Sequence, residues 1–339
     1  MFQVDLSHSL YRALVQQQGR CSLLKALLLA MALLFHASDG LTQPQSPLRI
    51  VIGQQAGAQI DVLGRLLAEK LRQDLARTVL VENRLGNSGI TAVESVKAAP
   101  VDGNTLLLVP LAVMVIMPLS QKNVRFDPLL DFEAVSHVVS YDMALAIAPQ
   151  LPAKNLAEFY ALAKSNPAQA SFAIPGVGGL SHFVTWMIAK QAGAELLFVP
   201  YKGPQPGITD LMGGQVAAMA SPLADFASLH RAGKLRVLAS SGSKRSTVLP
   251  EVPTFREQGY GVETNAWFAM FAPAASPKLA LDSVSRSLAT ALRNAEVREQ
   301  IARAGLDPVG GTREELASLL RRDVEQWRGI IKSAGFVAQ

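Results

Sequence analysis

Cysteine is almost missing from this sequence: Cys21 is the single one in 339 residues. It lies before residues 26–35, an apolar run that reads as the core of an export signal. We therefore expect the mature chain to contain no cysteine, which excludes disulfides, a thiol nucleophile and cysteine-ligated metals. Cys21 is also not a lipoprotein cysteine, because such a cysteine follows the apolar run and Cys21 precedes it.

Long apolar runs are missing as well. The ten apolar residues at 26–35 are too few to span a bilayer, but they suit a signal peptide. We expect residues 1–40 to be a signal peptide that is removed after export, with cleavage between Ala37 and Gly40. The alternatives are a short membrane anchor and a buried N-terminal helix.

The chain carries little charge of either sign. Charged residues make up 17% of it and the net charge is +5, with no block of lysines and arginines. We therefore expect no nucleic-acid partner. A hydrophobic content of 49% indicates a globular protein, and 339 residues are enough for two domains.

Familiar enzyme motifs are missing too. The sequence has no Gly-x-x-x-x-Gly-Lys-[Ser/Thr] phosphate loop, no Gly-x-Ser-x-Gly nucleophile turn and no His-Glu-x-x-His. His137, His182 and His230 are scattered and lack metal-ligand spacing. We expect no catalytic residue, no metal and no cofactor. The alternative is an exported α/β hydrolase acting on a small carboxylate or ester.

The sequence does contain a strand, a small-residue turn and a helix in direct succession. Residues 50–52 are an apolar strand, and apolar residues at helical spacing from Val62 onward predict a helix with Asp61 as its N-cap. We expect the backbone N–H groups of the turn to be free, with the helix dipole adding positive charge where they point. Because Gly57 has no side chain, a carboxylate can approach the main chain closely. The alternative is an ordinary strand-to-helix turn.

The same arrangement recurs about 120 residues later. Residues 171–174 predict a strand, 175–181 a glycine-rich loop, and 182–192 a helix with Ser181 as its N-cap. Two such sites from two lobes can face each other across a cleft. Each would then take one end of an acidic ligand.

Strands alternate with helices along the chain. The strands expected at residues 50–52, 78–82 and 105–109 are separated by helices, which indicates βαβ units and a mostly parallel sheet. Residues 138–149 read as extended and are a candidate crossover between two lobes, with 268–273 as the return strand. Near the C-terminus, Thr312 and Glu315 predict a capping box that starts a long helix.

Seven short motifs occur in a recognisable order. They are Asp61-Val62-Leu63-Gly64-Arg65-Leu66-Leu67-Ala68-Glu69-Lys70-Leu71, Val81-Glu82-Asn83-Arg84, Asp102-Gly103-x-Thr105-Leu106-Leu107, Phe126-Asp127-Pro128-x-x-Asp131-Phe132, Val199-Pro200-Tyr201-Lys202-Gly203, Leu249-Pro250-Glu251-Val252-Pro253-Thr254 and Pro308-Val309-Gly310-Gly311-Thr312. Each motif is weak alone, but together they are specific. Through them the chain resembles the periplasmic solute receptors of tripartite tricarboxylate transporters, also called Bug receptors, over residues 47–336.

The resemblance implies an α/β protein with the two-lobed, type II fold of periplasmic binding proteins, the Venus flytrap. Each lobe would be a mostly parallel sheet flanked by helices, with one lobe at residues 45–142 plus 262–339 and the other at 143–261. It implies a periplasmic receptor, not an enzyme, that captures a small organic anion between the lobes. The ligand would be a di- or tricarboxylate, an acidic amino acid or an aromatic carboxylate. We expect a monomer whose partner is a tripartite transporter in the membrane or a sensor.

The expected ligand contacts lie in four loops. They are Gln54, Gln55, Ala56, Gly57 and Ala58 in the first, Ser88 in the second, Gly176, Gly178, Gly179, Ser181 and His182 in the third, and Tyr201, Lys202 and Gly203 in the fourth. The first loop departs from the family pattern Pro-Phe-Pro-Ala-Gly-Gly-x-x-Asp, because Gln54 replaces an aromatic residue and Ala58 a glycine. We therefore expect a more polar pocket than is usual in the family. His182 either donates to a carboxylate or merely covers the loop, and Lys202 either pairs with the anion or is a solvated turn lysine.

Overall fold

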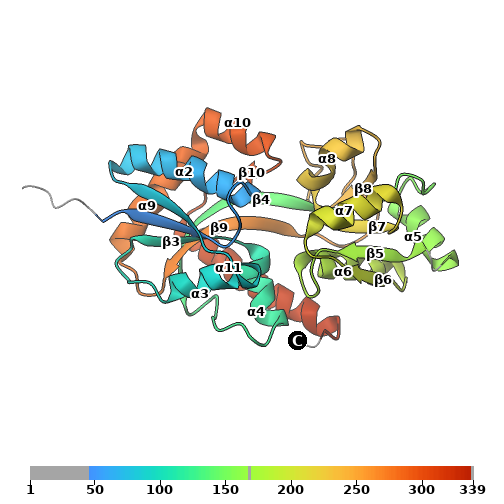
Figure 1. Cartoon of the computed structure of the whole chain (residues 1–339), viewed down its shortest axis with the longest axis horizontal. Helices are drawn as coiled ribbons and strands as arrows, with labels where there is room; N and C mark the ends of the chain where they lie inside the picture. The colour runs from blue at the N-terminus through green and yellow to red at the C-terminus, as the bar shows by residue number, and fades with distance from the viewer. Residues whose placement is uncertain (1–45, 167–168, 337–339) are drawn as a thin grey trace, which may run out of the picture. The chain divides into compact units, whose positions relative to one another are not determined.

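The computed structural model describes residues 46–166 and 169–336 (Figure 1). The expected signal peptide, residues 1–40, lies outside the described residues. Among the described helices, none is both long and apolar enough to cross a bilayer.

The described chain alternates strands and helices from end to end. The strands are β1 (Leu48–Ile52), β2 (Val79–Asn83), β3 (Thr105–Pro110), β4 (Phe132–Ile147), β5 (Ser171–Ile174), β6 (Leu197–Pro200), β7 (Ala218–Pro222), β8 (Arg236–Ser240), β9 (Asn265–Pro273) and β10 (Asp307–Pro308). The helices are α2 (Gln59–Leu75), α3 (Ile90–Lys97), α4 (Met117–Ser120), α5 (Leu156–Ser165), α6 (Leu180–Ala192), α7 (Pro204–Gly213), α8 (Leu223–Arg231), α9 (Lys278–Arg293), α10 (Ala295–Arg303) and α11 (Arg313–Ser333). Two short turns complete the set, the 3-10 turn η1 (Asn87–Gly89) and the π-helical turn η2 (Ala112–Ile116).

The first lobe is built on strands in the order β2-β1-β3-β9-β4. β1 pairs in parallel with both β2 and β3, as predicted for βαβ units. β1 and β3 are buried along almost their whole length because helices pack on both sides of this part of the sheet. Figure 1 shows α2 on one side and α3 on the other.

Two antiparallel strands, β4 and β9, run between the lobes (Figure 1). β4 is 16 residues long; its residues 132–142 pair with β9, and residues 143–147 pair with β7 of the second lobe. The predicted crossover and return strands are confirmed, although β4 begins six residues earlier than predicted. The lobe boundaries given above stay predictions.

The second lobe continues the sheet from β4 through β7 and β5 to β6. β5 pairs in parallel with β6 and β7, while β7 and β8 both pair antiparallel to β4. Parallel strands end at one edge of a sheet, and ligands bind outside that edge in open α/β sheets. The loops after β1, β2 and β3 therefore gather at one edge of the first lobe, and those after β5, β6 and β7 at one edge of the second.

Two predicted helix N-caps are wrong. α2 begins two residues before Asp61 and α6 begins one residue before Ser181, with Ala58 and Gly179 as their N-caps. Neither N-cap uses a side chain, since alanine and glycine carry no hydrogen-bonding side chain, and the Asp61 carboxylate accepts from the preceding loop instead. The predicted capping box of Thr312 is confirmed at the start of α11.

Candidate functional site

The turn between β1 and α2 is closed by its own backbone. The Ala58 N–H donates to the Gln55 carbonyl at 3.1 Å. Gly57 has a φ of +83°, a conformation that glycine adopts without strain. Gln55, Ala56 and Gly57 are exposed, whereas Gln54 and Ala58 are half-buried. The predicted contacts of the first loop thus lie mostly at the surface.

The carboxylate of Asp61 holds this turn in place. It is 1% exposed and accepts hydrogen bonds from the Gly57 N–H at 2.8 Å and from the side chains of Asn83 at 2.8 Å and Arg65 at 2.9 Å. The Asn83 amide also donates to the Gln54 carbonyl at 2.9 Å. Burial raises the pKa of Asp61, but the hydrogen bonds from Arg65, Gly57 and Asn83 outweigh it and bring the pKa below its ordinary value. Asp61 is therefore an ionised carboxylate that serves the turn itself.

The loop after β2 lies directly against this turn. The Cα of Gly89 is 2.7 Å from the position that a Cβ on Gly53 would take, so this close approach requires glycine at residue 53. Ser88 is exposed and has a φ of +54°, which is uncommon for serine. The first and second loops therefore form one continuous surface.

The loop after β5 is held at its central glycine. Gly178 is buried and has a φ of +72°. Its N–H donates to Nδ1 of His182 at 3.1 Å, and its carbonyl accepts from Oγ of Ser120 at 3.1 Å. Ser120 ends α4 of the first lobe, so this contact joins the two lobes. The remaining small residues of the loop, Gly176 and Gly179, are half-buried.

His182 covers the loop and keeps one donor. Burial lowers the pKa of His182, so the ring is neutral at pH 7. Because Nδ1 accepts from Gly178, the ring proton is on Nε2. The ring packs edge-on against Phe198, with a centroid distance of 4.6 Å. Among the described residues Nε2 has no hydrogen-bond partner, so His182 covers the loop and still has an N–H to donate.

The loop after β6 offers fewer hydrogen-bond donors to an anion than the loops before α2 and α6. The Tyr201 hydroxyl donates to the Asp210 carboxylate at 2.6 Å, and burial together with this bond raises the pKa of Tyr201 to about 12. Lys202 is exposed, and Gly203, with a φ of +94°, is the N-cap of α7. The first helical residue is Pro204, which has no N–H, so the N-terminus of α7 is a weaker anion site than those of α2 and α6.

Two of the backbone amides expected to be free have acceptors within the protein. The prediction that the amides of Gly57 and Gly178 are free is wrong, because Asp61 and His182 accept hydrogen bonds from them. Among the described residues, the amides of Gln59, Ile60 and Asp61 in α2 and of Leu180, Ser181 and His182 in α6 have no acceptor. Each set lies at the positive end of a helix dipole. The donors offered to an anion thus include two helix N-termini.

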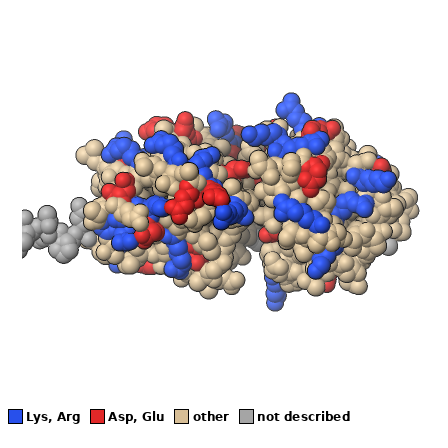
Figure 2. Space-filling model, turned by 90° about the horizontal axis from the view of Figure 1, so that it is seen from above, with Lys and Arg blue, Asp and Glu red and all other residues tan. Residues whose placement is uncertain are grey.

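A short helical segment after β3 lies between the two groups of loops. Val113 of η2 packs against Gly89, and Ser120 at the end of α4 reaches Gly178. The first-lobe loops and the second-lobe loop therefore border the same segment, η2 with α4. π-helical turns such as η2 are frequent at functional sites. Figure 2 shows the surface indented between the two halves of the molecule, with positive and negative side chains interspersed.

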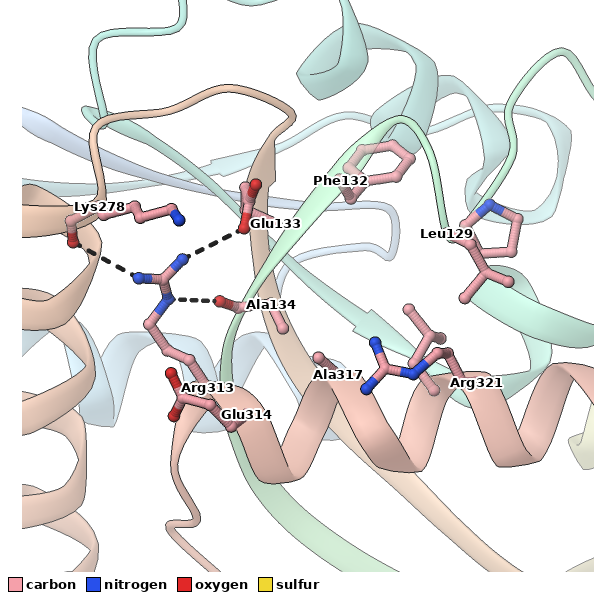
Figure 3. A pocket seen from close by; sticks show the side chains of 11 residues that line it. Leu129, Phe132, Glu133, Ala134, Lys278, Arg313, Glu314, Ala317 and Arg321 are labelled. Carbon is pink, nitrogen blue, oxygen red and sulfur yellow. Dashed lines mark hydrogen bonds and ion pairs between the residues drawn. The ribbon is translucent and has the colours of Figure 1, made fainter.

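A separate cavity of about 310 Å³ opens on the first lobe (Figure 3). None of the predicted ligand contacts lines it. Its central cation, Arg313, is 11% exposed and donates to the Ala134 carbonyl at 2.9 Å and to Glu133 at 3.2 Å. This guanidinium therefore already has its partners within the protein.

Comparison with known families decides between the two functions considered above, a solute receptor and an exported hydrolase. The family model of the tripartite tricarboxylate transporter family receptor matches residues 63–336. The chain belongs to this family. Its members are periplasmic solute-binding receptors rather than enzymes, which removes the hydrolase alternative. In the described part of the chain, no group of three or more histidine, cysteine or acidic residues could hold a metal.

Individual members of the family are similar to this chain over most of its length. Protein BugT of Bordetella pertussis is 32% identical over 91% of this chain and 97% of its own. The structure of the periplasmic binding protein BugD is 32% identical, with a TM-score of 0.76 over 88% of this chain and all of its own.

Two similar structures contain dicarboxylates. Rpa4515 of R. palustris, solved with adipate, is 27% identical with a TM-score of 0.78, covering 87% of this chain and 99% of its own. MatC from Rhodopseudomonas palustris, solved with bound malate, is 26% identical with a TM-score of 0.74, covering 85% of this chain and all of its own.

Three residues that hold the receptor's loops are absent from the predicted contacts: Asn83, Ser120 and Phe336. Asn83 is visible in the sequence as part of Val81-Glu82-Asn83-Arg84, a motif that could have pointed to it. Ser120 and Phe336 carry no such signal, because their roles depend on Gly178, from which they are far away in the chain.

Proposed function

We propose that this receptor captures a small organic anion between its two lobes. The supporting observation is the pair of helix N-termini, α2 in the first lobe and α6 in the second, each with three backbone amides that lack an acceptor in the described chain. A carboxylate is stabilised at such a terminus by the amides and by the helix dipole. A ligand with a carboxylate at each end can therefore bind both lobes at once.

The energies are sufficient for lobe closure. A hydrogen bond to a charged group contributes about 1.5 to 3 kcal/mol. If two such bonds form only when the second lobe closes on the ligand, they favour the closed form by a few kcal/mol. That preference shifts a two-state equilibrium substantially.

The ligand class we propose is a di- or tricarboxylate, an acidic amino acid or an aromatic carboxylate. The adipate and malate of two related structures are consistent with the first of these. Gln55 is exposed and Gln54 is half-buried in the first loop, which favours a ligand with additional polar groups over a purely aliphatic one. Nε2–H of His182 and the ammonium of Lys202 are further proposed contacts.

We also propose the setting in which the receptor acts. It is exported, its signal peptide is removed, and it works as a monomer in the periplasm. The closed, ligand-bound form is then recognised by the membrane subunits of a tripartite transporter or by a sensor. Differential affinity of the partner for the closed form is what makes such recognition depend on ligand.

A thermal-shift screen followed by calorimetry tests the proposal. The panel is malate, succinate, adipate, citrate, L-glutamate and benzoate, with adipamide as the uncharged match to adipate. A ligand at 100 times its Kd stabilises the folded state by about 2.7 kcal/mol, which raises Tm by roughly 5 to 10 °C. We expect at least one acid to do so and to be recovered unchanged. A flat response to every acid, or an equal response to adipate and adipamide, would count against the proposal.

A further inference from the structure

The chain beyond α11 turns toward the second lobe. Gly335, with a φ of +63°, reverses the direction of the backbone, and the Phe336 N–H donates to the Ile331 carbonyl at 3.4 Å. The Phe336 ring then packs edge-on against Phe183 and His182 of α6, with centroid distances of 5.4 and 5.7 Å. Figure 1 shows the C-terminal end of α11 beside α6. A residue that follows a helix packed on β4 and η2 thus contacts the first turns of a second-lobe helix.

The same ring closes over Gly178. A Cβ on Gly178 would lie 2.8 Å from Cζ and 3.1 Å from Cε1 of Phe336, so the ring fills the space in which a side chain would stand. Ser120, whose Oγ lies 3.4 Å from the same Cβ position, donates to the Gly178 carbonyl, and His182 accepts from the Gly178 N–H. Gly178 is therefore held by Phe336 and Ser120, which are far away in the chain, and by His182 of the following helix α6.

We propose that Phe336 is a positioning residue for the anion-binding end of α6. By packing on Gly178 and His182, it holds the loop after β5 in the conformation that presents the free amides of α6. Ligand affinity therefore depends on a C-terminal aromatic ring that is not itself a proposed ligand contact. This inference rests on the proposed function for its effect on binding, but its effect on the loop can be measured without a ligand.

Replacement of the ring is the direct test. In Phe336→Ala the loop loses its cover, so we expect the Kd for the best acid of the panel above to rise at least tenfold, measured by calorimetry well below Tm. Phe336→Leu keeps an apolar side chain at the same place and should stay within threefold of the wild type. The matched control is Phe126→Ala, which removes a buried ring that pairs with Phe132 in the first lobe. It should lower Tm and leave the Kd within twofold.

A double-mutant cycle tests the contact itself. Gly178→Ala places a Cβ against the Phe336 ring and also strains a positive φ. We expect it to raise the Kd at least tenfold in the wild type and by a clearly smaller factor when Phe336 is already alanine, because the clash with the ring is then absent and only the strain at the positive φ remains. Equal effects in the two backgrounds would show that the two residues act independently.

Hydrogen exchange separates this inference from the proposed function. Without any ligand, the Gly178 amide should exchange at least tenfold faster in Phe336→Ala than in the wild type, and at the wild-type rate in Phe126→Ala. If the wild type binds no acid of the panel, the proposed function is wrong, while the exchange rates still decide the role of Phe336. If both the exchange rate of Gly178 and the Kd are unchanged in Phe336→Ala, the inference is overturned.

Discussion

Replacing Asp61 by asparagine should destabilise the receptor and change its response to acid. The carboxylate is 1% exposed and accepts three hydrogen bonds, from Gly57, Asn83 and Arg65. Asparagine has the same shape, but its single carbonyl oxygen can serve the donors on only one side. Its NH₂ group then faces a donor on the other side. All three bonds also lose the charge of the acceptor.

The magnitude follows from these contacts. A hydrogen bond to a charged group contributes about 1.5 to 3 kcal/mol, and a neutral one about 1. Losing one bond and weakening the others should lower the free energy of unfolding of Asp61→Asn by about 2 to 4 kcal/mol at pH 7. Urea unfolding at constant m-value measures it. Asp74→Asn is the matched control, because Asp74 lies on the same helix and is exposed, and it should change stability by less than about 0.5 kcal/mol.

The pH dependence gives an independent check. The pKa of Asp61 is lower in the folded state than the unfolded value of about 3.9, so its stabilisation is present above that value and is lost as the pH falls through the folded pKa. The difference in stability between wild type and Asp61→Asn should therefore shrink as the pH falls below about 4. The reasoning is refuted if Asp61→Asn matches Asp74→Asn at pH 7, or if the difference is the same at pH 7 and pH 3.

Two further replacements should change the stability of the receptor in opposite directions. Asp323 accepts a hydrogen bond from the Trp267 indole at 2.7 Å, and burial raises the pKa of Asp323 to about 6. Because this pKa is higher than in the unfolded chain, the folded wild type loses stability as the pH rises from about 4 to about 6. Asp323→Asn keeps an acceptor without that cost and should be more stable at pH 8 by about 2 kcal/mol, with no gain at pH 4, as urea titrations at both pH values would show. Arg313→Met leaves Glu133, Asp282 and the Ala134 carbonyl without their guanidinium and should lower stability by about 2 to 4 kcal/mol. A loss below about 0.5 kcal/mol would mean that these bonds, of which Figure 3 shows those to Glu133 and Ala134, are not stabilising.

The residue pattern by itself determined the local elements and the class of fold. The strand at 171–174 forms at the residues predicted, because the apolar pattern that favours a strand acts over a few residues. The capping box of Thr312 is equally local. The order of these elements was enough to expect two lobes, each with parallel strands.

Which groups are left for a ligand depends on contacts between distant parts of the chain. Gly57 and Gly178 look like open donors in the sequence, but Asp61 and His182, each one helical turn ahead, fold back and take their N–H groups. Whether they do so depends on packing against partners far away in the chain. Asn83 lies 22 residues from Asp61, Ser120 lies 58 residues from Gly178, and Phe336 reaches the same loop from the other end of the protein. Spacing along the sequence carries no information on such contacts, because they form only when the sheet brings the ends of its strands together.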